Sequence, residues 1–347
     1  MTYRHKRIEK SIQQTCCRNN GTGEPLNAVN PLTGVFGLGY DQDNYGALLS
    51  RSGCRLVSGS LSTISVGGLG GSGKSLHSRR PAAEQRCPGG SGALVKNGAA
   101  LLTLNGANTF SGGLALNGGG LLLGNGSALG SGALSVGGNV TLDASAGLAL
   151  GNAIALGAGG SLNVLGGQPL VFNGGLIGAG GLIKNGASLL TLNGANDFSG
   201  GLAINAGTLA MGASGSLTAN VDVALSAGAT FDLSGGVATQ TIGTLAGAGG
   251  TVNLGANTLV FGNAGNQSFG GLITGAGGLV KVGSGVQTLT GANDFTGGVL
   301  LSAGGLLLGN NAALGTGNHA GRNRAAPGLE TAEVRRLVEL DLCGELA

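Results

Sequence analysis

The sequence has little charge, proline or aromatic character, and a great deal of glycine. Charged residues make up 10% of its 347 positions and aromatic residues 3%, with six prolines, no tryptophan and 76 glycines. A collagen-like triple helix is excluded, because it needs glycine at every third position and abundant proline. A disordered low-complexity chain is disfavoured by the 41% of hydrophobic residues, which supply apolar surface to offset the entropy of ordering. The composition favours a quasi-one-dimensional β architecture with frequent turns.

Charge is missing above all from the middle of the chain. Residues 91–317 contain no Glu, Arg, His or Cys, and their only charged side chains are three lysines and five aspartates. The flanks hold the remaining 18 − 3 = 15 basic and 15 − 5 = 10 acidic residues. No basic run alternates with aromatic residues, so no nucleic-acid partner is expected. We therefore divide the chain into an irregular N-terminal region and candidate cap (residues 1–90), a repetitive body (91–317), and a linker followed by one amphipathic helix (318–347).

The five cysteines lie in the flanks, and their spacing fits neither a zinc site nor a complete disulfide framework. The N-terminal stretch MTYRHKRIEKSIQQTCCRNN lacks the apolar core and cleavage site of a secretory signal peptide. Residues 144–183 are uncharged for 40 positions, long enough to span a membrane as a helix. Glycine interrupts this run every few positions, which costs a helix about 1 kcal/mol per residue relative to alanine. Short strands are therefore expected there.

One stretch occurs three times. GALVKNGAALLTLNGANTFSGG begins at Gly92, GGLIKNGASLLTLNGANDFSGG at Gly180, and GGLVKVGSGVQTLTGANDFTGG at Gly277. The copies align without gaps and are separated by 184 − 96 = 88 and 281 − 184 = 97 residues. The shared positions include a lysine and a phenylalanine: Lys96, Lys184 and Lys281, and Phe110, Phe198 and Phe295. Self-similarity at a long, regular period indicates a repeat architecture.

Between its glycine and asparagine turns the body alternates apolar and small residues, as in Leu102, Thr103 and Leu104. A period of two is typical of strands with one buried face. The predicted fold is therefore all-β, a right-handed parallel β-helix (solenoid), between a poorly ordered N-terminal region and a short C-terminal helix. At roughly 20–30 residues per coil the body makes about 8–11 coils, and Leu192 is expected inside the stack.

One motif suggests a nucleotide site. The segment GLGGSGKS at residues 68–75 fits the P-loop pattern, and LSTISV at 61–66 precedes it like a strand. Pro81 follows six residues after the motif, before a helix could present its N-terminus to phosphates. We interpret the match as chance in a glycine-rich chain and expect no nucleotide partner.

No catalytic, cofactor-binding or metal-binding residue is expected, and the chain is predicted not to be an enzyme. We interpret the repeat lysines as solvated turn residues that discourage edge pairing, with a basic ladder as the alternative. Asp197 and Asp294 replace Thr109 of the first copy, which favours a turn or cap over a metal ligand. The three phenylalanines are expected in the core, with a carbohydrate-stacking row as the alternative.

The unit G-G-L-x-K-x-G-x-x-x-x-T-L-x-G-x-N-x-[FY]-[ST]-G-G resembles the autotransporter-associated β-strand repeat, found in passenger regions of bacterial type V secreted proteins. The match is almost complete in the second and third copies, while the first has Ala93 in place of the second glycine. The resemblance implies a non-enzymatic, surface-exposed, stalk- or adhesin-like passenger whose repeat assists folding and export. It further implies a cell-surface location in a Gram-negative bacterium.

The same resemblance implies an outer-membrane translocator barrel as partner, with a host surface, a glycan or self-association as further candidates. The segment that follows Gly317, residues 318–347, is too short for such a barrel. The sequence is therefore expected to be a passenger fragment, a truncated or frame-altered gene remnant without function, or a relative exported by another route. A carbohydrate-active β-helix enzyme or lectin is the alternative function.

Overall fold

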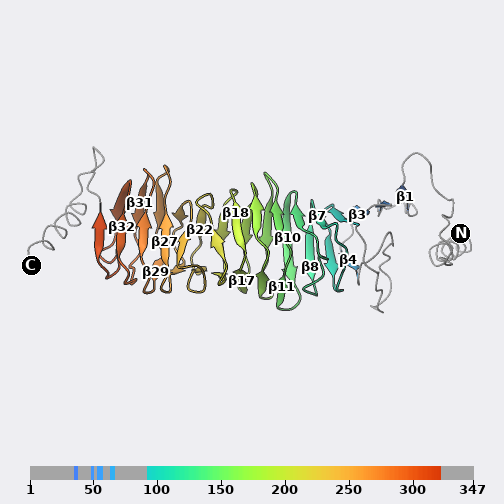
Figure 1. Cartoon of the computed structure of the whole chain (residues 1–347), viewed down its shortest axis with the longest axis horizontal. Helices are drawn as coiled ribbons and strands as arrows, with labels where there is room; N and C mark the ends of the chain where they lie inside the picture. The colour runs from blue at the N-terminus through green and yellow to red at the C-terminus, as the bar shows by residue number, and fades with distance from the viewer. Residues whose placement is uncertain (1–34, 38–47, 51–52, 58–62, 67–91, 322–347) are drawn as a thin grey trace, which may run out of the picture.

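The computed structural model describes residues 92–321 and four short strands that precede them (Figure 1). In this part of the chain all regular secondary structure is β, and from residue 92 onwards the strands form one elongated parallel stack. The four early strands are β1 (Val35–Gly37), β2 (Leu48–Ser50), β3 (Gly53–Val57) and β4 (Thr63–Val66). Among them, β1 pairs with β2 and β2 with β3 in antiparallel fashion, and β3 joins the stack by parallel pairing with β5 (Leu94–Asn97).

From residue 92 onwards the strands form three faces that run along the stack. The first face contains β5 (Leu94–Asn97), β7 (Leu114–Leu116), β9 (Leu134–Val136), β12 (Ile154–Leu156), β15 (Leu176–Gly178), β18 (Ala195–Phe198), β21 (Ser216–Leu217), β24 (Thr239–Thr241), β27 (Thr258–Phe261), β30 (Leu279–Lys281), β32 (Val299–Leu301) and β34 (His319–Gly321).

The second face contains β6 (Leu101–Leu104), β8 (Gly120–Leu123), β10 (Asn139–Ala144), β13 (Ser161–Val164), β16 (Gly181–Lys184), β19 (Leu202–Ile204), β22 (Val223–Leu225), β25 (Leu245–Ala246), β28 (Gln267–Phe269), β31 (Val286–Leu289) and β33 (Gly305–Leu308). The third face is confined to the middle of the stack and contains β11 (Leu148–Leu150), β14 (Leu170–Phe172), β17 (Leu189–Leu192), β20 (Thr208–Met211), β23 (Thr230–Asp232), β26 (Thr251–Asn253) and β29 (Leu272–Thr274). At both ends, turns take the place of this face.

Coil length varies slightly along the stack. Leu102 pairs with Leu121, a step of 121 − 102 = 19 in sequence number, whereas Val140 pairs with Leu162, a step of 162 − 140 = 22. Residues 92–321 make about 11 turns in all. The predicted parallel β-solenoid is confirmed, with coils at the short end of the expected range.

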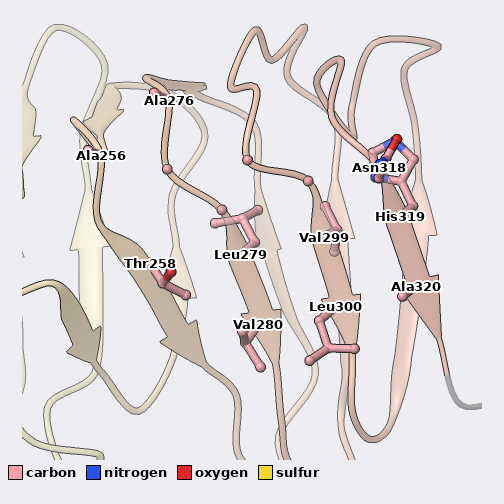
Figure 2. Close-up of a pocket in the computed structure, with 14 residues that line it drawn as sticks. Ala256, Thr258, Ala276, Leu279, Val280, Val299, Leu300, Asn318, His319 and Ala320 are labelled. Carbon is pink, nitrogen blue, oxygen red and sulfur yellow. The ribbon is translucent and has the colours of Figure 1, made fainter.

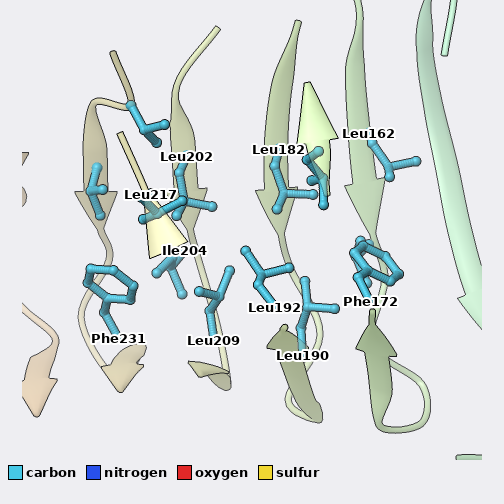
Figure 3. Close-up of a cluster of buried hydrophobic side chains, with 14 of the residues drawn as sticks. Leu162, Phe172, Leu182, Leu190, Leu192, Leu202, Ile204, Leu209, Leu217 and Phe231 are labelled. Atoms are coloured by element: carbon cyan, nitrogen blue, oxygen red, sulfur yellow. The ribbon is translucent and has the colours of Figure 1, made fainter. Parts of the chain in front are cut away.

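The core is a set of stacked rows of aliphatic and aromatic side chains. On the third face Leu170, Leu190 and Leu209 occupy one row in consecutive coils and are 0–1% exposed. Figure 3 shows such rows from two faces meeting inside the stack, with Leu192 among them. Full burial of a leucine side chain is worth about 1.5–3 kcal/mol, and repetition along the stack makes this the main stabilising contribution.

Parallel pairing extends beyond both ends of the repetitive body. Strand β4 pairs with β6, and β34 pairs with β32. The strand predicted at residues 61–66 is confirmed over Thr63–Val66 as β4, which pairs with the second face of the solenoid. The P-loop-like residues 68–75, the cysteines outside β3 and the predicted C-terminal helix lie outside the described residues.

Candidate functional site: the repeat clasps

Each of the three repeats carries a lysine whose side chain points into the solenoid. Lys96 lies in β5, Lys184 in β16 and Lys281 in β30, and their exposed fractions are 0%, 0% and 2%. In each strand the lysine follows an inward leucine by two positions, so strand geometry directs it inward. The interpretation of these residues as solvated turn lysines was wrong.

Each lysine Nζ donates hydrogen bonds to carbonyl oxygens of two successive coils. The acceptors are Asn97, Gly98 and Gly118 for Lys96 (3.0, 2.8 and 3.0 Å), Gly186 and Ala206 for Lys184 (3.1 Å to Ala206), and Val282, Gly283 and Ala303 for Lys281 (2.6, 3.1 and 3.5 Å). In all three copies one acceptor is two residues and another 22 residues beyond the lysine. We call this arrangement the lysine clasp, since it ties the turn after the lysine to the turn stacked on it.

A glycine in the second of these two turns, the one stacked on the turn after the lysine, makes the clasp possible. Gly119, Gly207 and Gly304 have φ values of 70°, 66° and 72°, a left-handed conformation that favours glycine. A Cβ at Gly304 would lie 2.3 Å from the Gly285 carbonyl oxygen and 2.4 Å from that of Gly283. The equivalent contacts at the other two glycines are 2.5–2.6 Å. Glycine is therefore required both by the backbone conformation and by the close approach of the two turns.

Burial lowers the pKa of all three lysines below the ordinary value of 10.5. Desolvation penalises the charged ammonium, while its carbonyl partners satisfy the N–H donors. The lysines do not form a basic ladder either, because Lys96 and Lys281 belong to the first face and Lys184 to the second.

The asparagine of the GAN turn forms a second link, the asparagine clasp. Asn108, Asn196 and Asn293 are 4%, 1% and 4% exposed. Their Nδ2 atoms donate to carbonyl oxygens of the next coil: Ala128 (2.6 Å), Ser216 (3.0 Å) and Ala313 (2.6 Å). In the second and third copies Oδ1 accepts the N–H of Leu176 (3.0 Å) and Ile273 (2.8 Å) in the coil before. One side-chain amide thus takes the place of a peptide group between two coils.

The three repeat phenylalanines lie in the core, as predicted: Phe110, Phe198 and Phe295 are 6%, 1% and 0% exposed. All other phenylalanines in residues 92–321 are 0% exposed. A carbohydrate-stacking row of these rings is therefore ruled out within the described solenoid.

The aspartates stand on the exterior. The carboxylate of Asp197 accepts hydrogen bonds from Thr218 Oγ1 (2.8 Å) and Asn220 Nδ2 (3.1 Å) in the next coil. These bonds, that from Asn220 above all, lower the pKa of Asp197. Both partners of Asp197 lie in the next coil and not in its own turn. The predicted local turn or cap is therefore wrong for this residue. Asp294 is exposed, and its backbone N–H donates to the Ile273 carbonyl oxygen (3.1 Å).

Because the lysines are buried, residues 92–321 expose carboxylates but no lysine or arginine side chain. No group of three or more His, Cys, Asp or Glu within the described residues could hold a metal ion. The same residues contain no helix long and apolar enough to cross a membrane.

A shallow depression lies on the outside of the first face near the last coils (Figure 2). Its volume is about 530 Å³. Gly277, Gly278, Gly297 and Gly298 contribute backbone to it, while Val280 and Leu300 supply apolar side chains. Its lining holds one ionisable side chain, His319, whose Nδ1 is buried without a hydrogen-bond partner and whose pKa burial lowers. No carboxylate, lysine or cysteine lines the depression beside it.

The three clasped segments match a known family model. The passenger-associated transport repeat matches residues 94–123, 182–211 and 279–308. The chain carries three passenger-associated transport repeats. Each matched passenger repeat contains the lysine of one lysine clasp and the asparagine of one asparagine clasp. The family match therefore includes the side chains that link successive coils.

A curated relative points the same way. The passenger repeats lie in a chain that is 33% identical over 117 residues to the adhesin BmaC autotransporter of Brucella suis biovar 1 (strain 1330). The alignment covers 34% of this chain and 3% of that relative. No solved structure matches. The resemblance to autotransporter passenger proteins seen in the sequence is confirmed.

Proposed function

We propose that this chain is a non-enzymatic, stalk- or adhesin-like passenger of an autotransporter-type surface protein, displayed on a Gram-negative bacterium. Its proposed partners are an outer-membrane translocator and, on the outside, a host surface, a glycan or a second copy of the chain. The repeats are proposed to assist folding and export.

The observation that carries this proposal is the recurrence of one inter-coil contact in all three passenger repeats. A solenoid built only from leucine rows could stack in several registers, because one leucine row resembles the next. A buried ammonium or amide has low energy only where its carbonyl partners are in place. The clasps therefore favour one register, as a chain that must fold coil by coil after translocation would require.

The chemistry of the exterior also supports a structural role. Asp143 extends from the second face and Asp197 from the first, and Asp232 lies on the third. Acid–base catalysis requires such groups to converge on one substrate. Dispersed carboxylates on a rod suit display better than catalysis.

The proposal is tested by surface proteolysis and fractionation of cells that express the full native locus, followed with an antibody against residues 91–317. We expect the signal outside the cell and a protease-resistant fragment of about the size of the solenoid. A cytoplasmic marker in the same cells controls for lysis. Signal confined to the cytoplasm and rapidly degraded would refute display at the surface.

A further inference from the structure

Backbone lies close to the amines of Lys184 and Lys281. A Cβ added at Gly304 or Gly262 would lie 3.0 Å from Lys281 Nζ, and one at Gly166 would lie 3.2 Å from Lys184 Nζ. Backbone therefore crowds these two amines, in addition to the carbonyl oxygens that accept their hydrogen bonds. An additional two-carbon group on the nitrogen would occupy the same volume as these turns.

We propose that the three repeat lysines are modification sites for small acyl donors such as acyl phosphates, and that acylation before folding keeps the clasped coils from closing. In this reaction the amine lone pair attacks the acyl carbon. The new N–C bond forms as the C–O bond to phosphate breaks, phosphate leaves, and the surplus amine proton passes to solvent. No other reactant is needed.

The product cannot replace the ammonium in the clasp. An N-acyl lysine is neutral and keeps one N–H, whereas the Lys96 amine donates to three carbonyl oxygens. Acylation would thus leave buried carbonyl oxygens without a donor and also add bulk. Orphaned buried acceptors and overpacking both destabilise a folded core.

The folded solenoid protects the same amines. Their exposed fractions are 0–2%, so an acyl donor can reach them only when a coil opens. The modification therefore acts on the unfolded chain and not on the finished rod. Residues 91–317 contain no other lysine, so these three amines account for the whole lysine reactivity of the body. This inference does not depend on display at a cell surface.

The first test is labelling of the unmodified full chain with acetyl phosphate, in buffer and in urea, with the sites mapped by mass spectrometry. We expect acetylation at Lys96, Lys184 and Lys281 to be at least about 100-fold slower in buffer, because it requires opening of a coil. Equal rates in the two conditions would overturn the proposal.

The second test is refolding of the chain after complete acetylation in urea, compared with a mock-treated chain. We expect loss of the cooperative transition or a lower urea midpoint. The control is the variant Lys96→Met/Lys184→Met/Lys281→Met, which keeps Lys6, Lys10 and Lys74. Its own midpoint should be unchanged by acetylation.

If the triple variant does not fold, the three single Lys→Met variants replace it. Acetylation should then reduce the midpoint of each less than that of the parent chain. An acetylated parent chain that refolds with the midpoint of the mock-treated chain would overturn the proposal, as would an equal loss in the triple variant.

Discussion

The Nζ atom of Lys96 lies 3.0 Å from the carbonyl oxygen of Gly118, 22 residues later and one coil further along the solenoid. The same 22-residue relationship joins Lys184 to Ala206 and Lys281 to Ala303. A contact that recurs at equivalent positions of all three repeats is a property of the repeat itself. It links the repeated sequence to the stacking of successive coils.

Replacing Lys184 by methionine should destabilise the solenoid by about 1–3 kcal/mol, because carbonyl oxygens lose a buried donor while the apolar stem is retained. Urea denaturation followed by circular dichroism measures the effect. The control Asp294→Asn alters an exposed side chain and should stay within about 0.5 kcal/mol of the parent. An unchanged midpoint for Lys184→Met would contradict the clasp.

The substitution Asn293→Leu should cost about 1–3 kcal/mol for each buried group that it leaves unsatisfied. Those groups are the N–H of Ile273 and the carbonyl oxygen of Ala313. Asn220→Ala, at an exposed asparagine, is the control. Equal urea midpoints for the two variants would show that the buried amide contributes nothing specific.

Gly304→Ala should be more destabilising than Gly159→Ala. Both glycines have positive φ, 72° and 73°, so each alanine pays a left-handed strain of about 1–2 kcal/mol. A Cβ at Gly159 meets nothing within 4 Å, whereas one at Gly304 would lie 2.3 Å from the carbonyl oxygen of Gly285. The difference in unfolding free energy therefore measures the close approach of the turns, and equal losses would rule that approach out.

The lysines predict how stability depends on pH. Burial lowers the pKa of each amine in the folded state, while the unfolded chain keeps the ordinary value of 10.5. Between these two values the unfolded chain binds more protons, so unfolding free energy should rise with pH towards 10.5. The triple Lys→Met variant lacks this contribution. The difference in unfolding free energy between the parent chain and the variant therefore separates the lysines from other titrating groups. If this difference in unfolding free energy, parent minus variant, fell as the pH rises, the burial of the lysine amines would be contradicted.

Leu192→Asp should abolish cooperative folding, since it places an unpaired charge at a position that is 0% exposed. Thr191→Asp is the matched control. Thr191 is half-buried. It pairs with Ala210 in the next coil, and Ala210 pairs with Asp232 in the coil after that. A carboxylate is therefore already present at this position of the face. A normal melting curve for Leu192→Asp would refute the inward assignment.

Much of the fold could be predicted from residues such as Leu102 and Leu104, because alternation along a strand fixes which side chains point inward. The same alternation applied to Leu94 and Lys96 would have placed the lysine inside. The glycine-rich turn after the lysine favours the opposite placement, because a charged side chain at such a turn is usually solvated. The carbonyl oxygens that accept its hydrogen bonds become visible only once two coils are stacked.

The rotation of the second repeat relative to the others could not be predicted. The spacings between the copies, 184 − 96 = 88 and 281 − 184 = 97, leave the face of each copy open. Individual coils differ in length, as the pairs Leu102–Leu121 and Val140–Leu162 show. Small differences in turn length accumulate over several coils, and they move Lys184 to a neighbouring face. The partners of Asp197 in the next coil, Thr218 and Asn220, could not be predicted for the same reason, because they depend on how the two coils align.

The central claim is that the three repeat ammonium groups are buried donors that join successive coils. Nitrogen-15 NMR of lysine-labelled protein at mildly acidic pH observes these groups directly. We expect three slowly exchanging Nζ–H signals, each removed by one of the Lys→Met substitutions at positions 96, 184 and 281. Exchange of all lysine Nζ protons at the rate of free lysine would contradict the clasp in every repeat.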